Sequence, residues 1–270
     1  MIPKVRLEKS GITTSRLGFG TSRLHYLGKR DRQRLLATAA ELGFIHFDTA
    51  PAYGDGICEA ALGEFIRGQR ERFVIATKYG IPPDPIAEAW PSLRSPLRAV
   101  RAIATRAGFR PTPLPPITPT DLRASVMRSL KRLGTDRIDI LFLHEPRRDR
   151  IPAPAAIVEE LWKLQRSGVV RAFGMSGGWS GLSGLLSIAP ALGMVVQTAE
   201  GEWPPEAAPD ITYGAIAASP QRYYSPAIAA SQAVQRLRAA SARRNGVVLV
   251  STNNPEHLRQ LAEALPESES

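Results

Sequence analysis

Eight short apolar runs, separated by segments with helical spacing, constrain the fold of this chain more than any other feature. Each run has the length and composition of a buried strand. Because parallel strands need crossover connections, the alternation predicts strands joined by helices. The expected strands cover residues 16–19, 44–47, 73–77, 139–143, 172–175, 194–197, 211–217 and 247–250.

The intervening segments carry helix start and stop signals. In the clearest of them, Thr118 stands at the N-cap, Pro119 at the first helical position, and Gly134 closes the apolar stripe. Eight such units in 270 residues favour one closed (β/α)₈ TIM barrel over residues 1–270 rather than an open sheet. Residues 4–18, with a Ser-Gly turn between alternating runs, predict a β-hairpin that covers the barrel floor.

Residues 79–118 interrupt this rhythm with a long loop rich in proline and arginine after the third strand. Loops of this length in compact domains are functional or disordered. A short helix over residues 95–108 fits the middle of the loop. Two interpretations stay open, a substrate lid and a mobile basic insertion with no catalytic part.

Composition excludes several classes of protein. The net charge is +10, but arginine is spread along the chain without zinc-finger spacing, so we expect small anionic ligands rather than nucleic acid, and no metal site. The single cysteine, Cys58, cannot form an intrachain disulfide and fits a reducing compartment. Without a long apolar stretch, a cytoplasmic protein with no membrane association is expected. The sequence does not fix an oligomeric state.

Four polar residues stand where the second, third and fourth strands end, namely Asp48, Tyr53, Lys78 and His144. Singly, each has an ordinary explanation as a turn former, a packing aromatic, a solvated lysine or a structural histidine. The strand ends of a barrel converge on one mouth, so their joint placement favours a common site.

These four groups suit proton delivery to a carbonyl that is being reduced. A free phenol has a pKa near 10, and a nearby ammonium is expected to lower the pKa of Tyr53 toward neutrality. Asp48 would keep Lys78 charged. His144 would position the carbonyl oxygen by a hydrogen bond.

Six motifs in order resemble those of the aldo-keto reductases. They are GFGTS at 18–22, FDTAPAYG at 47–54, ATKYG at 76–80, LFLHEP at 141–146, GMSG at 174–177 and VVQT at 195–198. The resemblance implies a (β/α)₈ barrel that binds NADPH, less often NADH, and reduces an aldehyde or ketone or oxidises the alcohol. It also implies a catalytic tetrad of Asp48, Tyr53, Lys78 and His144, with Tyr53 as the general acid. The implied partner is a small carbonyl or alcohol substrate.

The resemblance further implies the cofactor contacts. The implied set is Gly20, Thr21, Ser176, Gln197, Tyr213, Ser251, Thr252, Asn253 and His257. Ser176 and Gln197 would hold the nicotinamide carboxamide, and Tyr213 would stack on its ring. Gly177 stands where the family usually has Asn, so one carboxamide contact is missing or supplied by another residue.

The segment before Pro255 offers hydroxyls and backbone N–H groups at a helix N-terminus, which suits the adenosine phosphate. A plain N-cap by Asn254 explains the same residues. His257 stands where many members have Arg, which leaves NADP against NAD open, with NADPH favoured. Residues 219–246 and the C-terminal loop are shorter than is usual in the family, and Trp90 is either a substrate wall or an exposed loop aromatic.

Two other functions remain open from the residues alone. A barrel with a trimmed seventh unit and Gly177 could bind nucleotide as a sensor or regulatory subunit with negligible turnover. A lyase or aldolase could use Lys78 as a Schiff-base nucleophile without nicotinamide.

Overall fold

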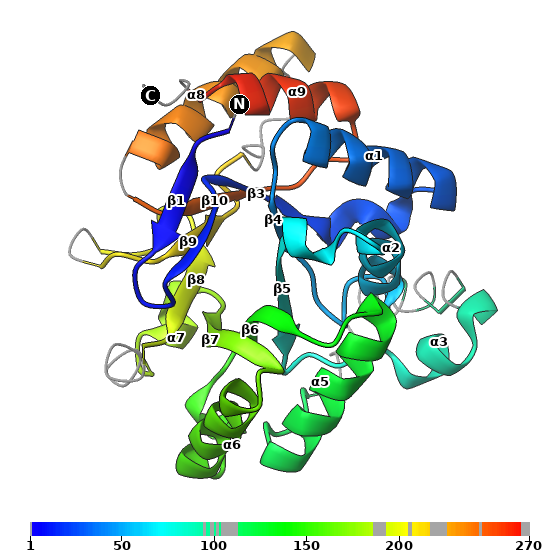
Figure 1. The fold of residues 1–270 in the computed structure, drawn as a ribbon, viewed down its shortest axis with the longest axis vertical. Coiled ribbons are helices and arrows are strands. Elements are labelled where there is room, and N and C mark those ends of the chain that lie inside the picture. Colours follow the sequence, from blue (N-terminus) through cyan, green and yellow to red (C-terminus); the bar gives the residue numbers. More distant parts are fainter. Residues whose placement is uncertain are drawn as a thin grey trace.

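Eight parallel strands close into a barrel with helices around it (Figure 1). This computed structural model describes residues 2–93, 96–97, 100, 103, 113–185, 193–204, 207–216, 226–242 and 245–265. Around the barrel the strand order is β10-β3-β4-β5-β6-β7-β8-β9. The strands are β3 (Leu17–Gly20), β4 (His46–Asp48), β5 (Val74–Tyr79), β6 (Ile138–His144), β7 (Val170–Ser176), β8 (Val195–Ala199), β9 (Ile211–Tyr213) and β10 (Val247–Val250). The predicted barrel is therefore confirmed.

Two of the predicted strands are shorter in the structure. The second strand lies two residues later than predicted at its start, because Phe44 N still bonds Ala39 O at the end of the preceding helix. The strand predicted over residues 211–217 ends at Tyr213, because Gly214 adopts a left-handed φ of 82° that turns the chain. Residue 217 itself lies outside the described residues.

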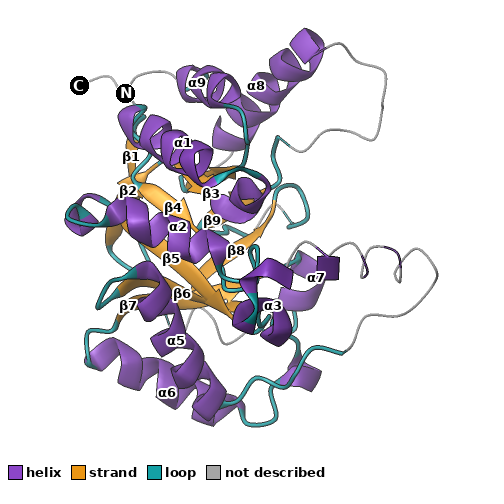
Figure 2. Ribbon diagram, turned by 90° about the vertical axis from the view of Figure 1, so that its right-hand side faces the viewer, coloured by secondary structure: helices purple, strands orange, loops and turns teal. Residues whose placement is uncertain are grey.

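Helices cover the outside of the barrel (Figure 2). They are α1 (Lys29–Glu41), α2 (Ile57–Ile66), α3 (Pro85–Ala89), α5 (Pro119–Leu133), α6 (Pro154–Arg166), α7 (Trp179–Leu182), α8 (Pro226–Ala242) and α9 (Pro255–Glu263). Short 3₁₀ turns cover Thr21–Tyr26, Arg70–Arg72, Pro91–Leu93 and Arg148–Arg150. The described part of the connection from β8 to β9 holds no helix, in contrast to the predicted alternation. Its prolines, Pro204 and Pro209 among them, remove backbone donors that a helix would use.

Helix α5 follows its sequence signals. Thr118 Oγ1 accepts from Asp121 N at 3.2 Å, and Pro119 occupies the first turn. Leu122 and Val126 are buried against the barrel. Gly134 ends the helix with a left-handed φ of 62°.

The N-terminal hairpin closes the floor of the barrel, as predicted. Strand β1 (Lys4–Leu7) pairs antiparallel with β2 (Ile12–Ser15). Its buried Val5, Leu7 and Ile12 pack in one cluster with residues inside the barrel, among them Val74, Ile140, Val195 and Val247. These barrel residues lie early in their strands, so the hairpin seals the N-terminal end.

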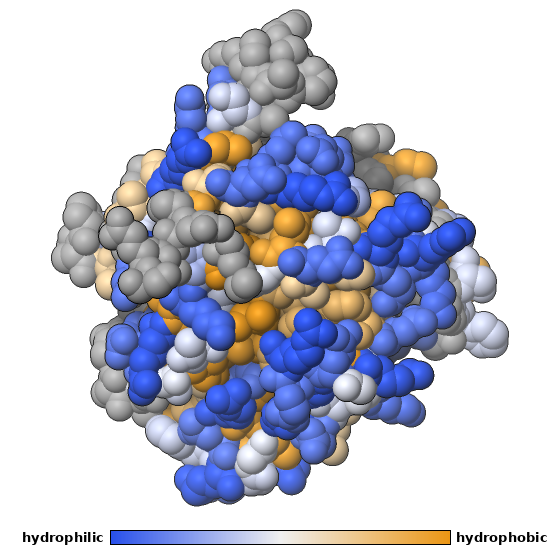
Figure 3. Space-filling model, turned by 45° about the horizontal axis from the view of Figure 1, so that its top comes forward, coloured by the Kyte–Doolittle hydropathy of each residue, from blue (hydrophilic) through white to orange (hydrophobic). Residues whose placement is uncertain are grey.

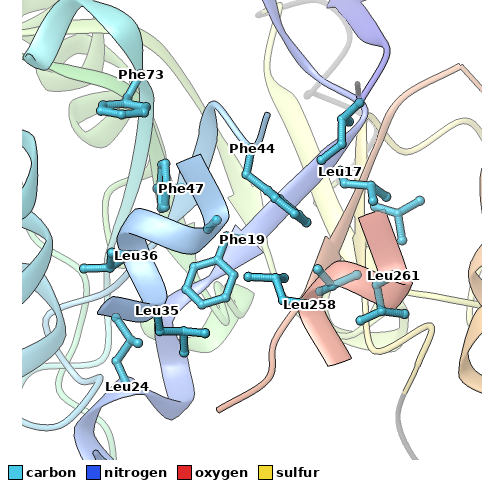
Figure 4. Close-up of a cluster of buried hydrophobic side chains, with 14 of the residues drawn as sticks. Leu17, Phe19, Leu24, Leu35, Leu36, Phe44, Phe47, Phe73, Leu258 and Leu261 are labelled. Atoms are coloured by element: carbon cyan, nitrogen blue, oxygen red, sulfur yellow. The ribbon is translucent and has the colours of Figure 1, made fainter. Parts of the chain in front are cut away.

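A second apolar layer lies between the strands and the outer helices (Figure 4). Phe19 contacts Phe44 and Phe47 edge to face, with ring centroids 6.4 and 6.0 Å apart. Fully burying a side chain of this size contributes about 1.5–3 kcal/mol. Several such rings around β3 and β4 hold these two strands, and with them the end of β4, in a fixed place.

The long loop after β5 is described only in part. It contains α3, whose N-cap Asp84 accepts from Ile86 N and Ala87 N. Most of the helix predicted over residues 95–108 lies outside the described residues, as does part of the segment 219–246. On the face drawn in Figure 3, hydrophilic side chains cover much of the surface and hydrophobic ones gather between them. Among the described residues, no helix is both long enough and apolar enough to cross a bilayer.

Candidate active site

The strand register brings the predicted site residues to one end of the barrel. Gly20 is paired with Asp48, and His144 with Ser176, which is paired in turn with Gln197. Side chains alternate along a strand, so His46 and Asp48 both point inward. The inward positions turn from apolar at the floor to polar at the carboxyl ends of the strands, where barrels carry their sites.

Asp48 and Lys78 form a buried ion pair at this mouth. Lys78 Nζ also donates to the backbone oxygen of Thr49 at 3.0 Å. Burial alone would lower the pKa of Lys78, but the charge of Asp48, helped by the Tyr53 phenol, outweighs burial and raises it. Lys78 is therefore a fixed cation.

Tyr53 lies on the turn that follows β4 and leads into α2. Its ring centroid is 5.0 Å from Lys78 Nζ and 6.2 Å from the ring centroid of His144. The structure thus brings all four predicted residues together. Burial raises the pKa of Tyr53 above its ordinary value of 10.0, and Lys78 offsets only part of that effect. The expected net lowering of this pKa was wrong, because desolvation of the phenolate outweighs the ammonium.

His144 ends β6 as a neutral imidazole. Burial, followed by the charges of Lys78 and Arg150, lowers the pKa of His144 to about 3. Its Nδ1 is buried and has no hydrogen-bond partner among the described residues. A neutral imidazole carries one N–H donor, which suits hydrogen bonding to an oxygen that develops negative charge.

Gln197 connects the predicted cofactor side of the mouth to the ion pair. Its Nε2 donates to Asp48 Oδ2 at 3.0 Å. Its Oε1 is buried and, within the described chain, lacks a partner. Ser176 lies beside it on β7 and is equally buried. An orphaned acceptor next to a hydroxyl fits an amide that offers both N–H and C=O groups, so these residues fit the nicotinamide carboxamide.

On the other side of the mouth, the Ser251 side chain packs closely against the backbone of Gly20. A Cβ on Gly20 would stand 2.4 Å from Ser251 Oγ, which donates to Gly20 O at 2.9 Å. Thr21 is fully buried, and its Oγ1 has no partner in the part of the chain that is described. This buried, partly unsatisfied junction between β3 and β10 fits a bound polar group.

Some of the polar groups in the segment before α9 are already used to cap the helix. Asn254 Oδ1 accepts from Glu256 N at 2.9 Å, so the predicted N-cap is present. Thr252 Oγ1 accepts from Asn254 N at 3.1 Å, whereas Asn253 Oδ1 finds no partner among the described residues. His257 is exposed in the first turns of the helix.

Of the two remaining predicted residues, Tyr213 lies at the mouth, whereas Trp90 lies on an exposed part of the loop after β5. Tyr213 ends β9 at the mouth, where burial and the nearby charges of Glu145 and Glu202 raise its pKa. Trp90 is 65% exposed at the end of α3. The hydrogen bonds of its backbone run to Ile86 and Leu93, within its own segment.

Sequence reasoning missed three contributors to the mouth. Thr49 acts through its backbone oxygen, which leaves no signal in the sequence. Arg150 is buried, and its guanidinium donates to the backbone oxygens of Gly80, Pro115 and Glu145. Arg150 therefore ties the loops after β5 and β6 together, and the basic run at 147–150 was the only signal for it. Glu145 directly follows His144 in the LFLHEP motif, but only the fold shows where the Glu145 side chain lies.

Several curated relatives match about two thirds of the chain. D-threo-aldose 1-dehydrogenase from a Pseudomonas species is 34% identical over 176 residues, which are 62% of this chain and 51% of the relative. An NADH-specific methylglyoxal reductase from Escherichia coli is 32% identical over 180 residues, covering 63% of this chain and 51% of the relative. The chain thus spans about half the length of the curated relatives it matches.

Solved structures share the fold over nearly the whole chain. The glycerol dehydrogenase of Gluconobacter oxydans has a TM-score of 0.69 at 18% identity and covers 99% of this chain and 91% of its own. An aldo-keto reductase from Klebsiella pneumoniae, in complex with NADPH, has a TM-score of 0.64 at 18% identity and covers 98% and 90%. The model of the aldo/keto reductase family matches residues 16–182, more than half of the chain. This protein belongs to the aldo/keto reductase family.

Proposed function

We propose that the protein reduces an aldehyde or ketone to an alcohol with NAD(P)H, and catalyses the reverse oxidation, with Tyr53 as the proton donor and acceptor. The single observation that carries the proposal is the grouping of Tyr53 with Lys78 and His144 at the mouth. The bound nicotinamide would supply the hydride for the carbonyl carbon. The chain's own residues would deliver the proton to the oxygen.

Tyr53 starts in the form that reduction needs. Because its pKa is raised, the phenol is protonated at neutral pH and can donate to the carbonyl oxygen. The phenolate that results is stabilised by the Lys78 ammonium, which Asp48 keeps charged. His144, neutral at this pH, donates a hydrogen bond to the same oxygen and orients the carbonyl.

The cofactor would lie across the second half of the mouth. Ser176 and Gln197 would hold the carboxamide, with Tyr213 against the ring, and Gly20, Thr21 and residues 251–253 would hold the rest. We propose NADPH rather than NADH, although an NADH-specific relative exists. The chain's positive net charge and the N-terminus of α9 support an extra phosphate.

The relatives' names suggest the substrate class. They act on an aldose, on methylglyoxal and on pyridoxal, which are small and polar carbonyl compounds or their alcohols. We propose the same class for this chain. The lyase alternative fits poorly, because a Schiff-base nucleophile needs a neutral amine and Lys78 is held as a buried cation.

The proposal is tested by replacing Tyr53 with Phe. Turnover of NADPH with a panel of small aldehydes, followed by absorbance, should fall about 100- to 10,000-fold, the usual contribution of a general acid. The dissociation constant for NADPH should stay unchanged, since the ring is retained. Tyr79→Phe is the matched control, because Tyr79 OH bonds Thr118 O at 3.2 Å away from the mouth, and its activity should persist. Tight NADPH binding by the wild-type chain without consumption across the panel would refute the enzyme and favour the sensor.

A further inference from the structure

Glu145 is a charged group at the mouth that the proposed mechanism leaves unused. Within the described residues, its carboxylate accepts no hydrogen bond and forms no salt bridge. Other buried acids are neutralised: Asp48 is paired with Lys78, and Glu59 with Arg132. A carboxylate at the convergence of the strands that has no partner within the described residues is a candidate group for contacting a bound ligand.

The backbone around Glu145 is held in an unfavourable conformation. Its φ is 49°, in the left-handed region that residues other than glycine rarely adopt. Glu145 N donates to Ser176 O at 2.7 Å, and Glu145 O accepts from Arg150 Nη1 at 3.1 Å. Strain that is enforced in this way is typical of residues with a functional position.

The conformation directs the carboxylate over the end of β7. A Cβ on Gly177 would stand 2.9 Å from Glu145 Oε2 and 3.2 Å from its Cδ. Glu145 therefore fills the space that any side chain at position 177 would need. Its charge also acts on Tyr213 across the mouth. The carboxylate thus lies beside Gly177, directly after Ser176, and close enough to Tyr213 to act on its pKa. Ser176 and Tyr213 are two of the residues proposed to surround the nicotinamide.

We propose that Glu145 binds the nicotinamide carboxamide in place of a side chain at position 177, and that its negative charge makes the protein bind the oxidised cofactor in preference to the reduced one. This inference rests on the proposed function, because it uses the same nicotinamide position.

The donor and acceptor groups match a carboxamide. Its NH₂ group has two donors, for which Gln197 Oε1 and the Glu145 carboxylate are two acceptors. The Ser176 hydroxyl can donate to the carboxamide oxygen. These hydrogen bonds to the carboxamide would fix which face of the nicotinamide ring is turned toward Tyr53.

The charge acts on one redox form only. The oxidised nicotinamide ring carries a positive charge that the reduced ring lacks, so an unpaired carboxylate nearby stabilises the oxidised form. Arg150 does not cancel this effect by a salt bridge, because its guanidinium N–H groups bond backbone oxygens. The equilibrium on the protein is thereby shifted toward alcohol oxidation.

The test compares dissociation constants of NADP⁺ and NADPH for wild type and Glu145→Gln by isothermal calorimetry. Glu145→Gln should weaken NADP⁺ binding about tenfold relative to NADPH, as expected for unit charges roughly 6 Å apart at an effective dielectric constant of about 40, between the values near a protein surface and in bulk water. A tenfold change in this ratio corresponds to about 30 mV in the potential of the bound couple. Glu159→Gln, which removes an exposed charge on α6 that pairs with Lys163, should leave the ratio unchanged.

A second pair of variants keeps the test decisive if Glu145→Gln fails to fold. Glu145→Asp and Glu145→Asn match in size, and both residues tolerate a left-handed φ. The Asp variant should keep the preference for NADP⁺, and the Asn variant should lose it. If NADP⁺ and NADPH both bind, and the ratio of their dissociation constants is the same in the Asp and Asn variants, the inference is wrong while the proposed function stands. If the wild type binds none of NADP⁺, NADPH, NAD⁺ and NADH, the proposed function itself is wrong.

Discussion

The floor and the mouth of the barrel treat buried charge in opposite ways. Near the floor, Asp139 is fully buried and receives Arg70, Arg171 and the backbone N–H of Ile75. At the mouth, Glu145 has no such partner among the described residues, and Gln197 Oε1 and His144 Nδ1 are unsatisfied. The charge of Asp139 is therefore satisfied within the fold, whereas the polar groups at the mouth are the ones proposed to contact a ligand. Acidic residues of the same charge can therefore serve stability at one end and recognition at the other.

The largest expected effect on stability comes from breaking the floor. Asp139→Asn would leave Arg70 without its carboxylate and should lower the free energy of unfolding by about 3–5 kcal/mol, the cost of breaking a buried pair. Urea unfolding followed by circular dichroism measures this loss. Glu145→Gln is the matched change at the mouth and should leave the unfolding free energy nearly unchanged. Equal losses in the two variants would remove the distinction between floor and mouth.

A second expected effect is a pH dependence of stability that comes from His46, which is buried in the barrel interior. Burial lowers the pKa of His46 to about 4, below its ordinary value of 6.5, so the folded protein holds His46 neutral. Between pH 6.5 and 4 the unfolded chain binds a proton that the folded chain does not, so stability falls as pH falls. The loss attributable to His46 reaches about 3 kcal/mol below pH 4.

This pH dependence is measured by urea unfolding at a series of pH values. His46→Leu should show a smaller slope of unfolding free energy against pH in that window. His144, whose pKa is also lowered, contributes with the same sign and keeps part of the slope. An unchanged slope in His46→Leu would show that His46 is not held neutral by the fold.

The smallest expected effect lies at the edge of the mouth. Asn254→Ala removes the N-cap of α9 and should cost about 1 kcal/mol of stability, whereas Asn254→Gly should cost only a few tenths. Thermal unfolding of the two variants distinguishes them. If the Ala variant instead loses NADPH affinity without losing stability, Asn254 serves the ligand rather than the helix.

Much of the fold could be predicted from the sequence, because hydrophobic periodicity and caps are local signals. The capped helix at Thr118 to Gly134 and the order of the eight strands are examples. The four residues at the mouth could also be predicted, since each stands at or just after a strand end. The helix predicted between β8 and β9 was wrong. The alternation of strands and helices in the other units predicts a helix there, but the prolines of this segment disfavour one.

The sequence by itself determined which residues reach the mouth, since a strand's end and its inward positions follow from a period of two. Only the tertiary structure decided their electrostatic state. Whether the pKa of Tyr53 rises or falls depends on a balance between burial and the distance to Lys78, which no local pattern encodes. In the same way, the position of Glu145 over Gly177 depends on the register of β6 against β7 and on a left-handed backbone held from outside the segment.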